Sequence, residues 1–397
     1  MNSIEIENQF TSGVYGKRDL TLVRGKGTTV WDDSGRPYLD CTSGIGVANI
    51  GHAHPHLAAA VTGQAQQLIT CQEMFYNDRR ASFLARLATI VPDGLNRFFL
   101  CNSGTEAIEA AIKFARISSG RPGIVATMRG FHGRTLGALS ATHKVQYRQP
   151  FLPLVPGFSH VPFGDINALD AALGQETAAV ILELVQGEGG VHVASQEYVD
   201  DLQALCMERD VLLIVDEVQT GFGRTGHWFA CDAFGLVPDV LCLGKAVAGG
   251  VPMGVTAMGG RIAELPIGVH GSTFGGNPLA CAAGLAALDI VQKEELVGRA
   301  AETGAYFIEQ LRTIESPLIR DVRGMGLMIG IDLRIRAMPV VHALLDSGVL
   351  VLTSGKTVIR LLPPLTISRS EIDRVVCALQ EILLEMELPV PAVSDGD

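Results

Sequence analysis

The sequence predicts an α/β protein, with a large domain built on a mainly parallel sheet and a smaller α+β domain. The 397 residues are 47% hydrophobic and only 18% charged, so the chain can bury one large core or two. Through the middle of the chain, continuous apolar runs alternate with segments of helical periodicity, which is typical of βαβ units and a parallel sheet. After about Leu285 the order of helices and strands becomes typical of an α+β domain.

The first elements are expected in the following order. Residues 28–44 predict a hairpin with its turn at residues 33–35. The strands of the large sheet lack alternating polarity, which indicates helices on both faces of the sheet. They are expected at residues 96–102, 123–128, 178–185, 211–217 and 239–244, with helices from about Thr105 and from Tyr198 to Glu208.

The C-terminal part is expected to contain an amphipathic helix after Leu285, strands within residues 319–333, 348–354 and 357–365, and a last helix that ends near Glu387. The Pro-rich polar tail after that helix is expected to fray. We therefore expect the smaller domain to be assembled from both chain ends, residues 1–50 and 286–397, beside a large domain of residues 51–285.

Charge and composition narrow the class of partner. The formal net charge of −11 disfavours nucleic acid and anionic membranes, since both repel an acidic surface. Eight cysteines without a C-x-x-C pair predict buried reduced thiols in a cytoplasmic protein. Residues 1–10 carry two glutamates and predict no signal or transit peptide. The apolar residues 237–258 are interrupted by charges, Pro252 and glycines, so no membrane span is expected.

Lys245 and Asp216 are the most informative residues of the chain. Lys245 lies in the apolar run VLCLGKAVAGG, so burial should lower the pKa of its amine and leave a neutral nucleophile suited to Schiff-base chemistry. Asp216 ends an apolar strand and should reach the crevice at the carboxyl ends of the parallel strands. There it could pair with the protonated pyridine nitrogen of pyridoxal 5'-phosphate (PLP). Together the two residues predict a PLP enzyme.

Two loops could hold other parts of such a ligand. Residues 103–105 (Ser-Gly-Thr) join a strand to a helix, whose free N–H groups could bind a phosphate, although an ordinary helix cap is the alternative. In the glycine-rich loop that follows the next strand, Phe131 could stack on a pyridine ring or belong to the core. Arg134 offers a site for a substrate carboxylate, with an internal ion pair as the alternative.

Further polar residues follow buried strands. Glu183, Gln186 and Glu188 leave a strand towards the crevice, where they could select amine substrates or act as structural hydrogen-bond partners. Arg360 lies in an apolar strand and therefore needs an anionic partner. The loop GSTFGGNP, with Ser272 and Thr273, has the composition of an anion-binding loop or of a plain turn.

Two other patterns are weaker. Residues 221–226 (GFGRTG) match the dinucleotide fingerprint, but no amphipathic helix is expected to follow them. His52, His54 and His56 alternate along the chain without a nearby cysteine or carboxylate, so no metal site is expected. Pro55 instead indicates a loop entering a helix.

The motifs, taken together, resemble those of the class III aminotransferases of PLP fold type I, the aspartate-aminotransferase-like fold. The similarity runs from about Ser12 to the last helix, and within the family it is greatest to the acetylornithine aminotransferase group. Residues 12–27 are similar to the branch that acts on lysine or ornithine linked to an amino-carrier protein. The motifs, in chain order, are SGTEA, FHGRT, QGEGG, DEVQTGFGRTG, LGKA, STFGGNP and IRLLPPL.

The resemblance implies a role for each matching residue around the cofactor. Lys245 would bond PLP and move the proton of the reaction, while Asp216 would keep the pyridine nitrogen protonated. Thr273 would complete the phosphate site of a neighbouring subunit, with Ser272 near the substrate, which implies a homodimer with shared active sites. The remaining cofactor contacts would come from Gln219 at the phenolic oxygen, from Phe131 and Val218 on the ring faces, and from Ser103, Gly104 and Thr105 at the phosphate.

The resemblance also implies how substrates bind. Arg134 would hold the carboxylate of the amino donor, and Arg360 the α-carboxylate of glutamate and 2-oxoglutarate. Glu188 would pair with Arg360 when the ω-amino donor is bound, and Tyr15 matches a tyrosine at the substrate entrance. The chain departs from the common E-P-x-Q-G run, because Leu184 stands where the family has proline.

The implied activity is transfer of the terminal amino group of an N-acylated ornithine or lysine to 2-oxoglutarate, in arginine or lysine biosynthesis. An ornithine or 4-aminobutyrate aminotransferase is the alternative within the class, and a non-catalytic binding protein is the alternative outside it. A small acidic amino-carrier protein is a further candidate partner. It would need a basic rim at the entrance, for which Lys17, Arg18, Lys26 and Lys144 are candidates.

Overall fold

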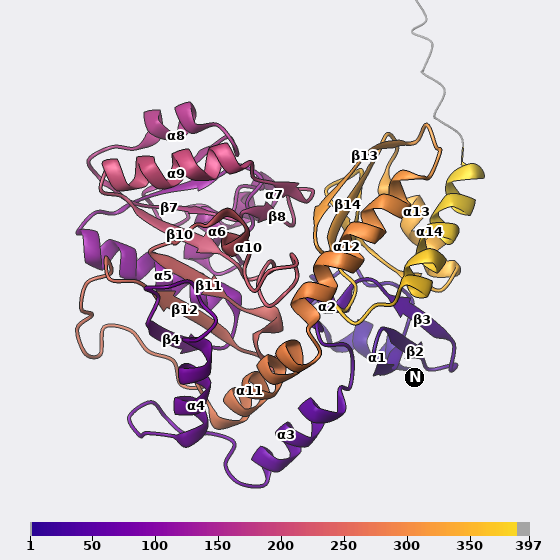
Figure 1. Ribbon diagram of the computed structural model, residues 1–397, viewed down its shortest axis with the longest axis horizontal. Coiled ribbons are helices and arrows are strands. Elements are labelled where there is room, and N and C mark those ends of the chain that lie inside the picture. Colours follow the sequence, from indigo (N-terminus) through magenta and orange to yellow (C-terminus); the bar gives the residue numbers. More distant parts are fainter. Residues whose placement is uncertain (1, 387–397) are drawn as a thin grey trace, which may run out of the picture.

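The computed structural model describes residues 2–386 and places a seven-stranded sheet at the centre of the larger part of the molecule (Figure 1). Five of its strands lie where the sequence predicts them. The strand order is β4 (Arg97–Cys101), β12 (Gly254–Met258), β11 (Val240–Leu243), β10 (Leu212–Asp216), β7 (Thr177–Leu182), β5 (Gly123–Thr127) and β6 (Phe158–Val161).

The sheet is mainly parallel, as predicted. Strand β12 pairs antiparallel with both of its neighbours, β11 and β4, and the other pairs are parallel. Strands β12 and β6 were not predicted. Strand β12 directly follows the glycine- and proline-containing residues 249–253, which indicate a turn, and β6 is a four-residue strand at the edge.

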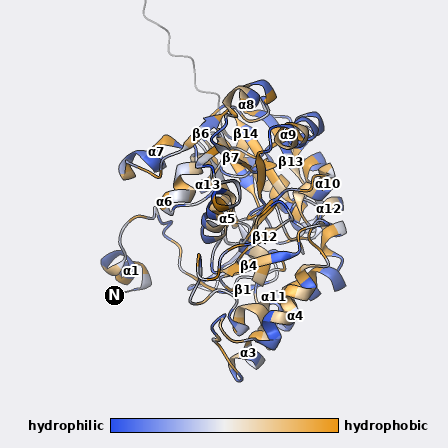
Figure 2. Cartoon of the chain, turned by 90° about the vertical axis from the view of Figure 1, so that its left-hand side faces the viewer, coloured by the Kyte–Doolittle hydropathy of each residue, from blue (hydrophilic) through white to orange (hydrophobic). Residues whose placement is uncertain are grey.

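Helices cover both faces of this sheet, which explains its continuous apolar strands. Alternate residues of β10 enter different cores: Leu213 and Val215 pack with helix α9 (Gln196–Glu208), whereas Leu212 and Ile214 pack with helix α5 (Gly104–Ser119). Both helices were predicted. Figure 2 shows the hydrophobic residues of the strands gathered in the interior. Since each face buries its side chains, no position of the strand is left for a polar residue.

The smaller part of the molecule combines both ends of the chain. The predicted hairpin is formed by β2 (Thr29–Asp32) and β3 (Pro37–Asp40), and β15 (Val349–Leu350) adds to it in parallel with β3. Strand β1 (Leu22–Lys26) completes this sheet. The pairing of β3 with β15 supports the two-ended small domain, and we keep the boundaries 1–50, 51–285 and 286–397 as a proposal.

A second small sheet carries the C-terminal strands, in the order β13 (Ile319–Met325), β14 (Met328–Leu333), β17 (Val358–Leu361) and β16 (Leu352–Ser354). Helices α12 (Leu296–Arg312), α13 (Ala337–Asp346) and α14 (Arg369–Leu384) share its core. The helix predicted after Leu285 begins earlier, because α11 spans Pro278–Lys293. The predicted helix end near Glu387 and the tail after it lie outside the described residues.

The remaining helices are short or peripheral. Figure 2 shows α1 and α7 at the edge of the molecule, outside the main body. No helix among residues 2–386 is long and apolar enough to cross a membrane. These helices are α1 (Ser3–Phe10), α2 (Ser43–Gly46), α3 (Pro55–Ala65), α4 (Asp78–Leu87), α6 (Leu136–Ala141), α7 (Val145–Arg148), α8 (Ile166–Ala172) and α10 (Ala230–Phe234).

Candidate active site

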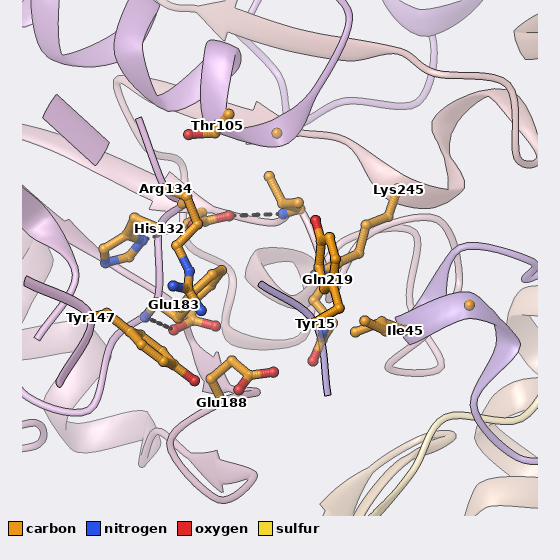
Figure 3. Close-up of a pocket in the computed structure, with 16 residues that line it drawn as sticks. Tyr15, Ile45, Thr105, His132, Arg134, Tyr147, Glu183, Glu188, Gln219 and Lys245 are labelled. Atoms are coloured by element: carbon orange, nitrogen blue, oxygen red, sulfur yellow. Dashed lines mark hydrogen bonds and ion pairs between the residues drawn. The ribbon is translucent and has the colours of Figure 1, made fainter. Parts of the chain in front are cut away.

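A hollow of about 500 Å³ lies at the carboxyl ends of the parallel strands (Figure 3). Strands β10, β11 and β7 each deliver a charged residue there, because parallel strands end at the same edge of a sheet. Most of the predicted site residues line this hollow: Tyr15, Gly104, Thr105, Phe131, Arg134, Glu188, Asp216, Val218, Gln219 and Lys245.

Lys245 lies two residues after the end of β11, behind Gly244, and begins a short 3-10 helix, Lys245–Ala248. Its backbone has a φ of 47°, a left-handed conformation that is uncommon for a non-glycine residue. Burial lowers the pKa of its amine to about 8, against the opposing effect of the Asp216 carboxylate. The predicted fall of this pKa is confirmed, and the neutral amine becomes the main form only above about pH 8.

Asp216, the last residue of β10, is held on both oxygens. Its Oδ2 lies 2.8 Å from Nδ1 of His132, and its Oδ1 accepts a hydrogen bond from the Val218 N–H at 3.0 Å. Burial opposes the charged form of His132, but the hydrogen bond and charge of Asp216 raise the pKa of the imidazole overall. The carboxylate is therefore fixed in orientation, and it faces the hollow that Lys245 also lines.

The start of α5 supplies the possible phosphate site. Ser103 is the N-cap, and its hydroxyl bonds Glu106, so the ordinary cap interpretation holds for that residue. Gly104 and Thr105 instead line the hollow. A Cβ atom on Gly104 would lie 2.6 Å from Val218 Cγ1, so only glycine lets the backbone and this side chain approach so closely.

Glu183 and Gln186 act as hydrogen-bond partners of the loops around the hollow. Glu183 accepts from the Phe131 N–H at 3.0 Å and from the Gly187 N–H at 3.2 Å. Burial raises the pKa of this carboxyl to about 7. Gln186 donates from Nε2 to the Met128 carbonyl at 2.8 Å. Of the two readings of these residues, the geometry favours the structural one.

Arg360 finds the anionic partner that its apolar strand requires. It lies in β17, is 2% exposed, and donates from one terminal nitrogen to Glu188 Oε1 at 2.6 Å. Its other terminal nitrogen donates to Gln219 Oε1 at 3.3 Å. The arginine thus lies behind two lining residues, Glu188 and Gln219, at the wall of the hollow.

The mouth of the hollow contains residues that the sequence did not single out. The Arg134 guanidinium lies over the ring of Tyr147, 3.7 Å from its centre, and both residues line the hollow (Figure 3). Gly44 and Ile45 line the opposite side and have left-handed backbones. No sequence motif marks Tyr147 as a site residue. It follows Phe131 by sixteen residues, and only the fold brings it to the site.

Ser272 and Thr273 do not reach this hollow within one chain. They line a separate depression with Gln72 and Met74. The Ser272 hydroxyl accepts from the Asn102 side chain at 3.1 Å and from the Gly275 N–H at 3.0 Å. Their role in a neighbouring subunit stays a prediction.

The two weaker patterns have structural explanations. In GFGRTG, the buried Arg224 donates to the Leu327 carbonyl at 3.0 Å and to the Asn49 side chain, which ties this turn to the smaller part of the molecule. His52 pairs with Asp40 at 2.7 Å, and His54 caps α3. Within residues 2–386, no three His, Cys, Asp or Glu side chains are grouped to hold a metal ion.

A buried lysine, an oriented aspartate and a helix start around one crevice of an α/β sheet define a PLP-dependent enzyme. The family model of the class III aminotransferases matches residues 14–383, and the chain belongs to this family. It is accordingly a PLP-dependent transaminase of fold type I.

Relatives extend over nearly the whole chain. The LysW-aminoadipate semialdehyde transaminase of Deinococcus radiodurans is 50% identical over 381 residues, covering 95% of this chain and 89% of that protein. The acetylornithine aminotransferase of Methanothermobacter thermautotrophicus is 46% identical, covering 96% and 98%. The crystal structure of the ornithine aminotransferase from Toxoplasma gondii superposes with a TM-score of 0.92 at 34% identity, covering 96% and 94% of the two chains.

The residues around the hollow fit PLP. A nucleophilic lysine, a carboxylate for the ring nitrogen and the start of α5 for the phosphate lie on one cavity. A Cβ atom on Gly244 would lie 3.1 Å from the Gly104 Cα, so glycine lets the residue before Lys245 lie close to the start of α5. The donor set is therefore the one that PLP chemistry requires.

Proposed function

We propose that the enzyme transfers the terminal amino group of an N-acylated ornithine or lysine to 2-oxoglutarate, giving a semialdehyde and glutamate. One observation carries this proposal: two arginines, one lining the hollow and one behind its wall, are in different states. Arg360 is buried and paired with Glu188, whereas Arg134 is exposed at the mouth and has no carboxylate ion pair within residues 2–386. Two substrates whose carboxylates lie at different distances from the amino group need two such cations.

The free arginine suits the amino donor. In an ω-amino donor, the carboxylate is several carbons away from the reacting amine, so it extends towards the mouth, where Arg134 would bind it in a charge-assisted contact. In glutamate, the α-carboxylate is next to the amine, so Arg360 at the wall would bind it. Glu188 would neutralise Arg360 while the donor is bound and move aside for glutamate, because an unpaired buried guanidinium is costly.

The chain's own groups would handle the proton. PLP supplies, when bound, an aldehyde that takes up the amino group and a ring that withdraws electrons. The Lys245 amine would take a proton from the substrate carbon that bears the amino group and deliver it to the carbon that receives the amino group. The lowered pKa of the amine favours this role. Asp216, fixed by His132, would hold the positive charge of the ring nitrogen. Gln219, Phe131 and Val218 would hold the ring, and Gly104, Thr105 and Ser103 the phosphate end.

A homodimer is part of the proposal. Large apolar side chains are exposed around the depression that contains Thr273, including Met74 at 75%, Phe75 at 63% and Phe274 at 61%. Buried Arg80 joins the segment around Phe75 to the segment around Phe274, because it donates to the Phe75 and Gly276 carbonyls at 3.0 Å. An ordered apolar surface of this kind supports burial against a second copy, whose hollow would receive Thr273 and Ser272.

The names of the relatives support two donors and one alternative. The LysW-aminoadipate semialdehyde and acetylornithine enzymes both support an N-acylated donor, and place the reaction in lysine or arginine biosynthesis. The first of them also supports an amino-carrier protein as partner. A cytoplasmic location is proposed because all eight cysteines are free thiols. The ornithine aminotransferase supports the alternative of a donor with a free α-amino group.

A donor comparison tests the proposal. Glutamate formation from 2-oxoglutarate is measured with N-acetylornithine, ornithine and 4-aminobutyrate, and we expect the highest kcat/KM with N-acetylornithine. Lys245→Ala should lose roughly 10²–10⁴-fold in kcat. A higher kcat/KM with ornithine or 4-aminobutyrate would establish the alternative, and an unchanged kcat of the variant would favour a different base.

A further inference from the structure

The part of the chain that contributes Arg134 and Tyr147 to the mouth is unusually basic for this protein. Residues 110–164 contain seven Lys and Arg and no Asp or Glu, although the whole chain has a net charge of −11. Arg134, Lys144 and Arg148 lie in this stretch, and none forms an ion pair with a carboxylate of residues 2–386. Cations that the chain itself does not neutralise are available to an anion from outside.

Tyr147 brings two of these cations together. The Arg134 guanidinium lies 3.7 Å from the centre of its ring, and Lys144 Nζ lies 4.6 Å from the same centre and 3.3 Å from the Tyr147 hydroxyl. Cation–π contacts of this kind hold charged groups in place without neutralising them. Arg134 and Tyr147 line the hollow, whereas Lys144 is exposed beside them, just before α7. The second cation is therefore on the outer side of the mouth, and α7 lies at the edge of the molecule (Figure 2).

The position of Lys144 becomes important for substrate choice when the donor is N-acylated, so this inference rests on the proposed function. The acyl nitrogen and the α-carboxylate of an N-acylated donor are bonded to the same carbon. If Arg134 binds the α-carboxylate, the acyl group must leave the hollow next to Arg134, along the Tyr147 ring. A neutral acetyl group would end there, but a longer acyl group with a carboxylate would reach Lys144.

We propose that Lys144, beside the Arg134–Tyr147 stack, selects amino donors whose N-acyl group carries a second carboxylate. Tyr147 is the positioning residue of this pair of cations. The same carboxylate could belong to a free dicarboxylic acyl group or to the last residue of a carrier peptide linked through its side chain.

The other basic residues considered for the entrance are engaged elsewhere. Lys17 forms an ion pair with Glu7 at 2.7 Å, and Arg18 donates to the Val351 carbonyl at 2.7 Å. Lys26 is exposed on β1 and does not line the hollow. Lys26→Gln is thus a matched control, because it removes the same charge from an exposed lysine that is not stacked on Tyr147.

The test compares N-succinylornithine with N-butyrylornithine, whose acyl groups have the same number of carbons but only one of which has a carboxylate. We expect the native enzyme to prefer the succinyl donor in kcat/KM. Lys144→Gln should lower the preference by about three- to fivefold, the size that one exposed ion pair gives, and Lys144→Glu should lower it further. Lys26→Gln should leave the ratio as it is.

Tyr147 has its own readout. Tyr147→Leu should raise KM for both donors more than it lowers kcat, since Arg134 loses its support, and Tyr147→Phe should restore KM because the ring remains. If Tyr147→Leu only impaired folding, the smaller fraction of active enzyme would lower the apparent kcat and leave KM unchanged.

A third donor, ornithine on a short peptide linked through the side chain of its last residue, separates the two sources of the carboxylate. A Lys144 effect on succinylornithine supports a free acyl group, and an effect confined to the peptide donor supports a carrier. Equal ratios in the native enzyme and Lys144→Gln with both donors would overturn the inference. If the native enzyme forms no glutamate from any N-acylated donor, the proposed function itself fails.

Discussion

At the scale of single residues, the Lys245 amine has the most direct consequence for pH dependence. Its pKa is lowered to about 8 by burial, so the neutral, reactive form predominates only above this pH. The rate at which the apoenzyme takes up PLP should therefore rise about tenfold per pH unit below 8 and level off above it. Stopped-flow absorbance measures this rate. A rise that continues to the ordinary lysine pKa of about 10.5 would contradict the account.

The pairing of Arg360 with Glu188 predicts a selective defect. Arg360→Met removes the cation proposed for the 2-oxoglutarate carboxylate, so KM for 2-oxoglutarate should increase about 10- to 100-fold. KM for the N-acylated donor, which is proposed to contact Arg134, should change far less. Arg320→Met, on strand β13 of the same sheet, is the control for loss of an arginine. Equal increases of both KM values would show that Arg360 does not distinguish the substrates.

At the scale of elements, the start of α5 makes a structural prediction. In Gly104→Ala, the new Cβ meets Val218 Cγ1 at 2.6 Å, which should cost roughly 1–3 kcal/mol and shift the wall of the hollow. PLP affinity, measured by fluorescence titration of the apoenzyme, should fall. Gly298→Ala, in α12, has nothing within 4 Å of its Cβ and should leave the affinity as it is. Unchanged affinity in both variants would remove α5 from the cofactor site.

The elements also show what the sequence can predict. Strand β10 and its terminal Asp216 were predictable, because four consecutive apolar residues indicate a strand buried on both faces and a carboxylate ends the run. Strand β12 was not, since its five buried residues have the same composition as the apolar turn before it. The Arg360–Glu188 pair joins residues 172 positions apart, so composition requires a partner for Arg360 without identifying it.

The mouth shows the same limit. Arg134 could be picked out as a cation in a glycine-rich loop, whereas only the fold brings Tyr147 under its guanidinium and into the lining of the hollow. His132 was visible between two glycines, but its contact with Asp216 depends on the adjacency of separate strand ends. The contacts of Arg134 with Tyr147 and of His132 with Asp216 both depend on tertiary packing, which a local sequence pattern does not predict.

At the scale of the whole molecule, the exposed apolar surface around Phe75 predicts an obligate assembly. Phe75→Asp places a charge in the proposed interface, so it should yield monomers by sedimentation velocity, and activity should fall with the loss of Thr273 from the neighbouring hollow. Met207→Asp changes an exposed residue on α9 and should leave the dimer intact. A fully active monomer would contradict shared active sites.

The central claim is that an N-acylated ω-amino donor gives its amino group to the enzyme and 2-oxoglutarate removes it. The most direct measurement is a single-turnover absorbance scan of the PLP-loaded enzyme mixed with N-acetylornithine alone, then with 2-oxoglutarate. We expect the cofactor band to disappear with the donor and to return with the acceptor. A band that N-acetylornithine leaves unchanged, while ornithine or 4-aminobutyrate removes it, would contradict the account.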